Sequence, residues 1–115
     1  MKTLMPVLLL LAFPCMCLAE AVPGAREVLL DNPAVEVVRL TYPVGSESGM
    51  HTHAYPNRVA YVVQGGTLEL IPGDPAAPRQ ELTLSDGQAV FLAAATHNVR
   101  NAGDTEIVMI EIELK

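Results

Sequence analysis

The stretch that decides the fold runs from residue 45 to residue 53 and reads Gly45-Ser46-Glu47-Ser48-Gly49-Met50-His51-Thr52-His53. It ends in two histidines that stand two positions apart. On an extended strand this spacing places both imidazoles on one face, roughly 6.5–7 Å apart along the backbone. Two neutral imidazoles on one face are half of a transition-metal site. Because a His-x-His pair also arises by chance, the pair alone leaves a surface or hydrogen-bonding role open.

Short segments of strand-forming residues, separated by turn residues, extend on both sides of this stretch. Gly65-Gly66 indicates a tight hairpin, and Asp31-Asn32-Pro33 and Ser85-Asp86-Gly87 are typical turns. The only helix-favouring spot after residue 25, residues 93–95, is too short to form a helix. About eight short strands with close turns predict an all-β sandwich or barrel. The predicted strands cover residues 27–30, 35–41, 59–64, 67–71, 81–84, 88–92, 97–101 and 105–114.

The third and last histidine of the chain, His97, lies far from the first two at the start of another predicted strand. A β-barrel can bring distant strands together around one interior. His51, His53 and His97 are therefore the candidate ligands of a metal site.

Two sets of residues resemble the paired motifs of the cupin superfamily, over nearly all of the chain after residue 25. The resemblance implies a single jelly-roll β-barrel with a pocket, in which the three histidines bind one divalent transition metal: Fe, Mn, Ni, Zn or Cu. Cupins include dioxygenases, isomerases, decarboxylases and proteins that only bind a ligand. The matching residues are Gly45, His51, His53 and Gly65 for the first motif, and Gly87, His97 and Asn101 for the second.

The chain departs from the first motif where that motif usually has a glutamate ligand. Arg58 stands there, and it cannot bind a metal. Asn57 precedes it, and adjacent strand residues face opposite ways, so at most one of the two enters the pocket unless a bulge intervenes. Gln64 shares the face of Arg58. These three are candidate pocket or substrate residues: Arg58 can hold a substrate carboxylate, or point outward to a surface acid. The second motif lacks its usual Pro and Gly.

Three functional hypotheses follow from these residues. The first is a metal-dependent small-molecule enzyme, for example an oxygenase that uses a three-histidine iron site. The alternative is a non-enzymatic cupin that binds a small ligand, with or without metal, and Arg58 in place of glutamate favours it. The third is a structural module in which the histidines have no role. Because one fold supports many chemistries, the fold does not select the reaction.

The N-terminal residues have the order of a secretory signal peptide. Lys2 precedes an apolar run over residues 4–13, and Cys17-Leu18-Ala19 supplies small residues for cleavage after Ala19. The apolar run is shorter than the ~20 residues of a membrane-spanning helix, and neither cysteine follows the usual pattern of a lipid anchor. We therefore expect a signal peptide at 1–19, a flexible start at 20–25 and a cupin domain at 26–115, secreted or periplasmic, without cysteines.

The net charge of −6 indicates which partners suit the chain. An acidic chain without a basic patch is not suited to nucleic acid, and it is not drawn to anionic membrane surfaces. We expect a small-molecule ligand, no membrane anchor in the mature form, and possible pairing into a homodimer through an exposed edge strand.

Overall fold

The computed structural model describes residues 22–115, so the predicted signal peptide at residues 1–19 lies outside the described residues. Within residues 22–115 the chain forms nine strands and no helix, which confirms the all-β prediction. No helix in this range is long and apolar enough to cross a bilayer. The strands are β1 (Ala25–Asp31), β2 (Val35–Tyr42), β3 (His51–Thr52), β4 (Asn57–Gln64), β5 (Gly66–Pro72), β6 (Gln80–Leu84), β7 (Ala89–Ala93), β8 (Thr96–Asn101) and β9 (Ile107–Leu114).

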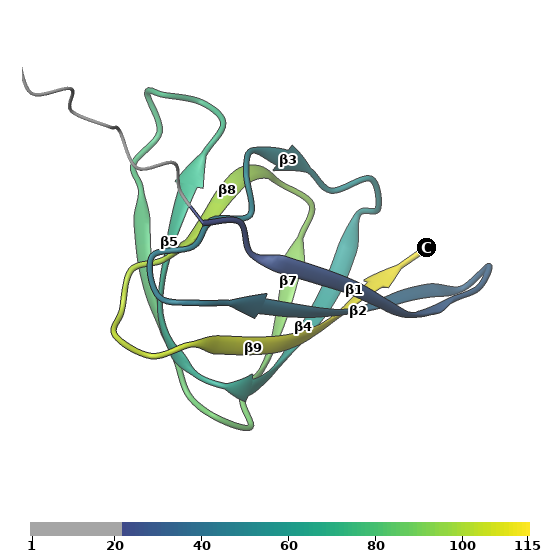
Figure 1. Ribbon diagram of the computed structural model, residues 1–115. Coiled ribbons are helices and arrows are strands. Elements are labelled where there is room, and N and C mark those ends of the chain that lie inside the picture. The colour runs from purple at the N-terminus through teal and green to yellow at the C-terminus, as the bar shows by residue number, and fades with distance from the viewer. Residues whose placement is uncertain (1–21) are drawn as a thin grey trace, which may run out of the picture.

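The strands form two antiparallel sheets. One sheet has the order β1-β2-β9-β4-β7, and the other has the order β3-β8-β5-β6. The sheets lie on either side of a shared interior, with β5 and β8 on one side and β2 and β9 on the other (Figure 1). This is the predicted jelly-roll arrangement, in which side chains of both sheets meet inside.

The described part of the expected flexible start is held in place. Gly24 donates its backbone N–H to the carbonyl of Glu47 at 2.8 Å, and Glu47 donates to the carbonyl of Val22 at 3.0 Å. Strand β1 then begins at Ala25, one residue before the predicted domain boundary. These contacts tie the start of the domain to the loop that precedes the two histidines.

Turn residues place the strands at the predicted points. The Asn32 side chain accepts hydrogen bonds from the N–H groups of Ala34 and Val35, which closes the β1–β2 turn. Gly65 must be glycine, because a Cβ at this position would lie 2.1 Å from the carbonyl oxygen of Leu84. Gly49, with φ of +81°, turns the chain immediately before His51.

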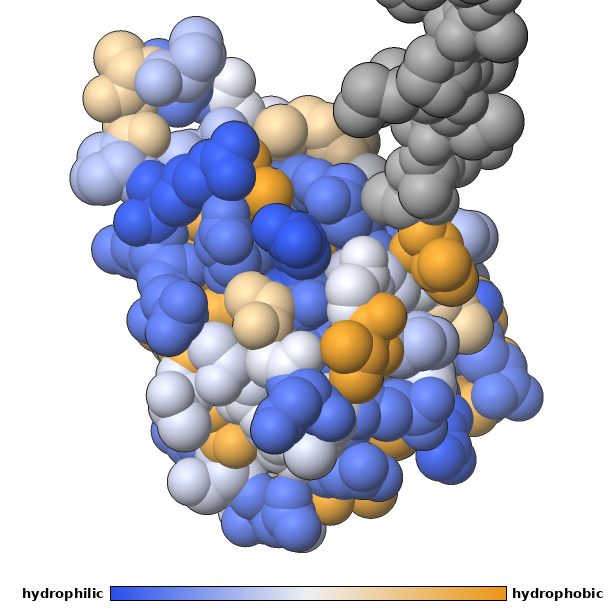
Figure 2. Space-filling view, turned by 60° about the vertical axis from the view of Figure 1, so that its left-hand side comes forward, coloured by the Kyte–Doolittle hydropathy of each residue, from blue (hydrophilic) through white to orange (hydrophobic). Residues whose placement is uncertain are grey.

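The main hydrophobic cluster lies between the two sheets and contains seven buried side chains, several of which also line the cavity that contains the histidines. Apolar residues of both sheets contribute, as expected for a sandwich whose inner faces interdigitate. On the face shown in Figure 2, hydrophilic residues predominate and hydrophobic ones form small groups. The core residues are Tyr42, Val62, Leu68, Leu84, Val99, Ile107 and Met109.

Strand β9 carries both core and polar residues on its inner face. Ile107 and Met109 belong to the core, and the inner face continues with Glu111 and Glu113 toward the histidines. Glu113 is buried, with 6% of its surface exposed. Ile110 and Ile112 alternate with these acids and are half-buried on the outer face. One strand therefore leads from the apolar core into a polar site.

Candidate metal centre

The fold brings the three predicted histidines together. His51 on β3 pairs directly with His97 on β8 in the strand register. His53 follows the end of β3, and its backbone N–H still donates to the carbonyl of Ala95 at 3.1 Å. The two-residue spacing keeps His51 and His53 on one face, and the cross-strand pairing supplies the third ring.

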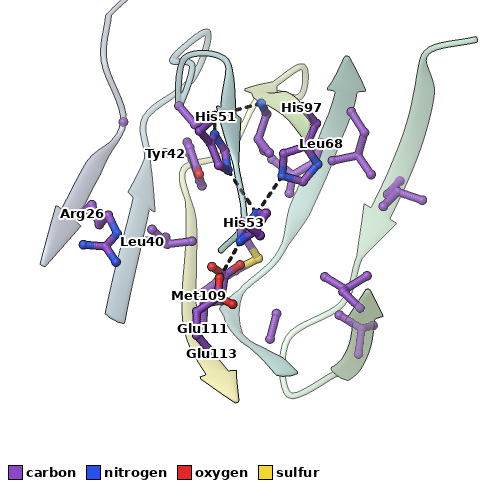
Figure 3. A pocket seen from close by; sticks show the side chains of 18 of the residues that line it. Arg26, Leu40, Tyr42, His51, His53, Leu68, His97, Met109, Glu111 and Glu113 are labelled. Atoms are coloured by element: carbon purple, nitrogen blue, oxygen red, sulfur yellow. Dashed lines mark hydrogen bonds and ion pairs between the residues drawn. The ribbon is translucent and has the colours of Figure 1, made fainter. Parts of the chain in front are cut away.

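The Nε2 atoms of the three rings converge on one point (Figure 3). His53 Nε2 lies 3.1 Å from His51 Nε2 and 3.1 Å from His97 Nε2. Two nitrogens that each lie about 2.1 Å from one ion are about 3.0 Å apart at a right angle and about 3.4 Å apart at the tetrahedral angle. The observed spacings therefore fit three ligands of a single ion.

The other ring nitrogens show which tautomers are present. His51 Nδ1 lies 2.9 Å from the carbonyl oxygen of Gly49, and His53 Nδ1 lies 2.5 Å from Oε1 of Glu113. A carbonyl or carboxylate oxygen only accepts, so each Nδ1 carries the proton, and each neutral ring presents its Nε2 lone pair to the cluster. The facing lone pairs of His51 and His53 repel each other, which a cation between them relieves.

Burial favours the neutral form of His53 and of His97. It lowers the pKa of His97 to about 4, with neighbouring His51 and Arg58 adding to the effect. Burial also lowers the pKa of His53, although the hydrogen bond to Glu113 opposes the shift. The neutral imidazole is the form that binds a metal, so both rings are ready to bind a metal at neutral pH.

Two acidic residues complete the site, and neither was predicted to belong to it. Glu113 accepts a hydrogen bond from the Nδ1–H of His53, and about 8% of the Glu113 side chain is exposed. Glu111 lines the same cavity, and burial raises its pKa to about 7. The sequence signal was the alternation of these acids with isoleucines in β9, which identifies a strand but does not say which face is inside.

Arg58 lies inside the barrel. The alternative considered from the sequence, an outward Arg58 that meets a surface acid, is therefore wrong. Only 4% of Arg58 is exposed. Its Nη1 donates to the carbonyl of Ala93 at 2.6 Å, and its Nε lies 3.3 Å from Glu111 Oε2. Arg58 pairs with Glu113 in the register of β4 and β9. The acid that the usual motif carries on β4 is therefore found across the ladder, on β9.

The remaining candidate pocket residues do not line the cavity that contains the histidines. Asn57 is half-buried, on the face of β4 opposite to Arg58. Gln64 is exposed, which corrects the expectation that it shares the inward face of Arg58. The physical reason is a β-bulge between Val62 and Gln64, which changes the alternation of faces at the end of β4. Arg58 is buried and contacts Glu111, which lines the cavity, but Arg58 is not itself one of the lining residues.

A second group of potential ligands consists of His53, Glu111 and Glu113, whose ligand atoms also lie within 4.8 Å of one another. Two features make it the weaker cation site. The carboxylate of Glu113 already accepts a hydrogen bond from the Nδ1–H of His53, and the guanidinium of Arg58 forms an ion pair with Glu111. These acids therefore serve best as partners of His53 and Arg58.

Comparisons with known proteins agree with this architecture. Residues 38–113 match the family model described as a cupin domain. The beta-alanine degradation protein BauB of Pseudomonas aeruginosa is 38% identical over 98 residues, which cover 84% of this chain and 95% of that protein.

Solved structures show the same fold. A cupin domain from Bordetella pertussis superposes with a TM-score of 0.75 at 30% identity, covering 84% of this chain and 97% of that one. A protein with a double-stranded β-helix domain from Klebsiella pneumoniae has a TM-score of 0.63 at 19% identity, covering 80% of this chain and 76% of that one, and this likeness concerns the fold alone. The chain therefore belongs to the cupin domain family.

Proposed function

We propose that this cupin binds one divalent transition metal through His51, His53 and His97 and uses it to act on a small organic molecule inside the barrel. The observation that carries the proposal is the convergence of Nε2 atoms at 3.1 Å spacings, with Nδ1 of His51 and His53 engaged elsewhere. Three histidines leave further coordination positions open for substrate and water, as in catalytic sites.

The residues of the site have separate tasks in the proposed function. The three imidazoles hold the ion, and Glu113 fixes the ring of His53 so that its Nε2 faces the ion. Arg58 neutralises Glu111 behind the ligands. The bound metal supplies Lewis-acid chemistry, or O₂ chemistry if it is iron.

The relative BauB, named for beta-alanine degradation, supports a small carboxylate metabolite as the first substrate class to examine. The metal-free alternative rested on Arg58, whose positive charge in the position of a ligand would repel a cation. The charge of Arg58 acts on the rings, since it contributes to the lowered pKa values of His53 and His97, but its Nε lies 3.3 Å from Glu111 Oε2, and this paired acid offsets part of the repulsion of a cation.

Elemental mass spectrometry of the chain without a histidine tag tests the proposal. We expect about one metal ion per chain after reconstitution with Fe, Mn, Ni, Zn or Cu, and none in a His51→Ala/His53→Ala variant. The preferred ion then directs the assay: O₂ consumption for iron, and hydrolysis or isomerisation for zinc or manganese. Absence of a stoichiometric ion from every reconstitution would contradict the proposal.

We also propose that the chain is exported, on the strength of the residues at 1–19. We expect the chain to be recovered from the periplasm or the medium, with the intact mass of a protein that starts at Glu20. Retention of Met1 in the exported protein would contradict cleavage after Ala19.

A further inference from the structure

The cavity that contains the histidines is larger and more apolar than a metal site requires. Its volume is about 450 Å³, within the roughly 300–1,000 Å³ range of small-molecule pockets. Apolar side chains of both sheets form most of its wall. Six of them are Leu40, Leu70, Leu82, Val90, Leu92 and Met109.

Apart from the ion pair of Arg26 and Glu36, the titratable side chains of the cavity lie mostly at one end. The histidines and the two β9 acids lie together there (Figure 3). Ser48 stands beside them, with its Oγ 3.4 Å from His51 Nδ1. Tyr42 lines the same cavity and lies beside His51 (Figure 3). A ligand that fills the cavity therefore meets polar partners at one end and aliphatic carbon over most of its length.

The charge at the polar end selects the head group, and this step rests on the proposed function. A bound divalent cation and Arg58 together carry three positive charges. Glu111 and Glu113 carry at most two negative charges against them. The net charge is positive, so an anionic oxygen ligand is attracted and an ammonium group is repelled.

Away from the histidines, the charged side chains of the cavity lining are Arg26 and Glu36, and these two form an ion pair with each other. The rest of that part of the lining carries no charge to pair with a second charged group of a ligand. A charged group placed among the leucines would lose its hydration without gaining a partner. We propose that the ligand is a single-headed amphiphile, with one carboxylate directed at the metal and an aliphatic or aromatic body in the leucine-lined part, and not a short zwitterion such as an ω-amino acid.

Calorimetry on the zinc-loaded chain with butanoate, hexanoate, octanoate and 6-aminohexanoate tests this proposal. Each methylene that moves from water to the aliphatic wall should tighten binding by about fourfold, so affinity rises steadily from butanoate to octanoate. At equal chain length, 6-aminohexanoate should bind at least tenfold more weakly than hexanoate. Equal affinities along the series, or tighter binding of 6-aminohexanoate, would overturn the proposal.

A matched pair of variants locates the binding. Val90→Phe places a ring in the cavity and should remove most of the gain from hexanoate to octanoate. Ala89→Phe places the same ring on the exposed outer face of the same strand and should leave the series unchanged. An unchanged series in Val90→Phe would contradict binding inside the barrel.

A second series separates this inference from the proposed function. In the His51→Ala/His53→Ala variant, uncharged 1-butanol, 1-hexanol and 1-octanol should still bind more tightly with length, because the aliphatic wall is intact. If the parent binds no metal but the alcohols keep this trend, the metal function fails and the apolar body of the ligand stands. If metal binds but neither series depends on length, the inference fails and the metal function stands.

Discussion

The two sheets contribute different chemistry to the same site. The four-stranded sheet provides the proposed ligands, since His51 and His97 face each other across β3 and β8. The five-stranded sheet provides a carboxylate that orients His53, and an ion pair behind it, from β4 and β9. One sheet therefore determines which nitrogen atoms would meet an ion, and the other determines how firmly His53 is held and what net charge surrounds the site.

Burial acts on both sides, but in opposite electrostatic directions. On the histidine side it lowers the pKa of His97, which favours the neutral base. On the acidic side it raises the pKa of Glu111, which favours the neutral acid. Each shift follows from the cost of charge in a poorly hydrated interior. Changes on the two sides should therefore have distinguishable effects on stability, metal affinity and pH dependence.

The largest expected effect is the loss of Arg58, which leaves Glu111 buried without its cation. Arg58→Met should lower the free energy of unfolding by about 3–5 kcal/mol, measured by urea denaturation at pH 8. Arg58→Met/Glu111→Met should recover most of this loss, because it removes both charges. The control is Arg79→Met, which breaks the exposed pair with Glu69 and should cost about 0–1 kcal/mol. Equal costs for the two single variants would show that Arg58 is not part of a buried pair.

The histidine side should control metal affinity. His97→Ala removes one of three ligands and should weaken binding of zinc by more than about 100-fold, since loss of a mere orienting partner costs about 10–100-fold. Thr96→Ala, on the exposed opposite face of β8, should leave affinity within about twofold. A competition titration with a chelating dye measures both. Similar affinities in the two variants would exclude His97 as a ligand.

The link between the two sides is Glu113. Glu113→Gln keeps the shape of the side chain but no longer fixes the proton on His53 Nδ1, so zinc affinity should fall by about 10–100-fold. Glu106→Gln, in the exposed turn before β9, is the charge-matched control and should change affinity little. A folded Gln variant, checked by its backbone NMR spectrum, that keeps the single Nδ1–H tautomer of the parent at His53 would contradict the orienting role of Glu113. A mixed tautomer at His53 is the expected result.

The smallest expected effect is the pH dependence of the metal-free protein. A raised folded-state pKa means that Glu111 contributes stability below its unfolded pKa and loses it as pH rises through about 7. His97 acts oppositely, since its lowered pKa gives stability that is lost as pH falls toward 4. The stability of the parent relative to Glu111→Gln should therefore fall by about 1 kcal/mol from pH 6 to pH 8. A difference that stays constant over this range would contradict the burial of Glu111.

The fold and the histidine side could be predicted from the sequence, because both depend on local signals. Spacing of two on a strand fixes the shared face of His51 and His53, and Gly65 and Asn32 mark turns with specific backbone needs. The third ligand, His97, was accessible only through the order of the two motifs. That order implied that His97 joins the other two histidines in one pocket, and the register of β3 and β8 places it opposite His51.

The acidic side could not be predicted, because it depends on long-range geometry. Alternation in β9 is compatible with either face inside, and the usual preference for buried isoleucine points the wrong way for Glu111 and Glu113. Only the pairing of β9 with β4 shows that these acids meet Arg58. The bulge that turns Gln64 outward has no evident mark in the sequence.

The most direct test of the central claim is ¹⁵N NMR of the imidazoles during titration of the metal-free chain with zinc. At one equivalent, the Nε2 signals of His51, His53 and His97 should all move to the range of metal-bound nitrogen, while Nδ1 of His51 and His53 stays protonated. A response from only two rings, or a metal-bound Nδ1 of His53, would contradict a three-histidine centre held in place by Glu113.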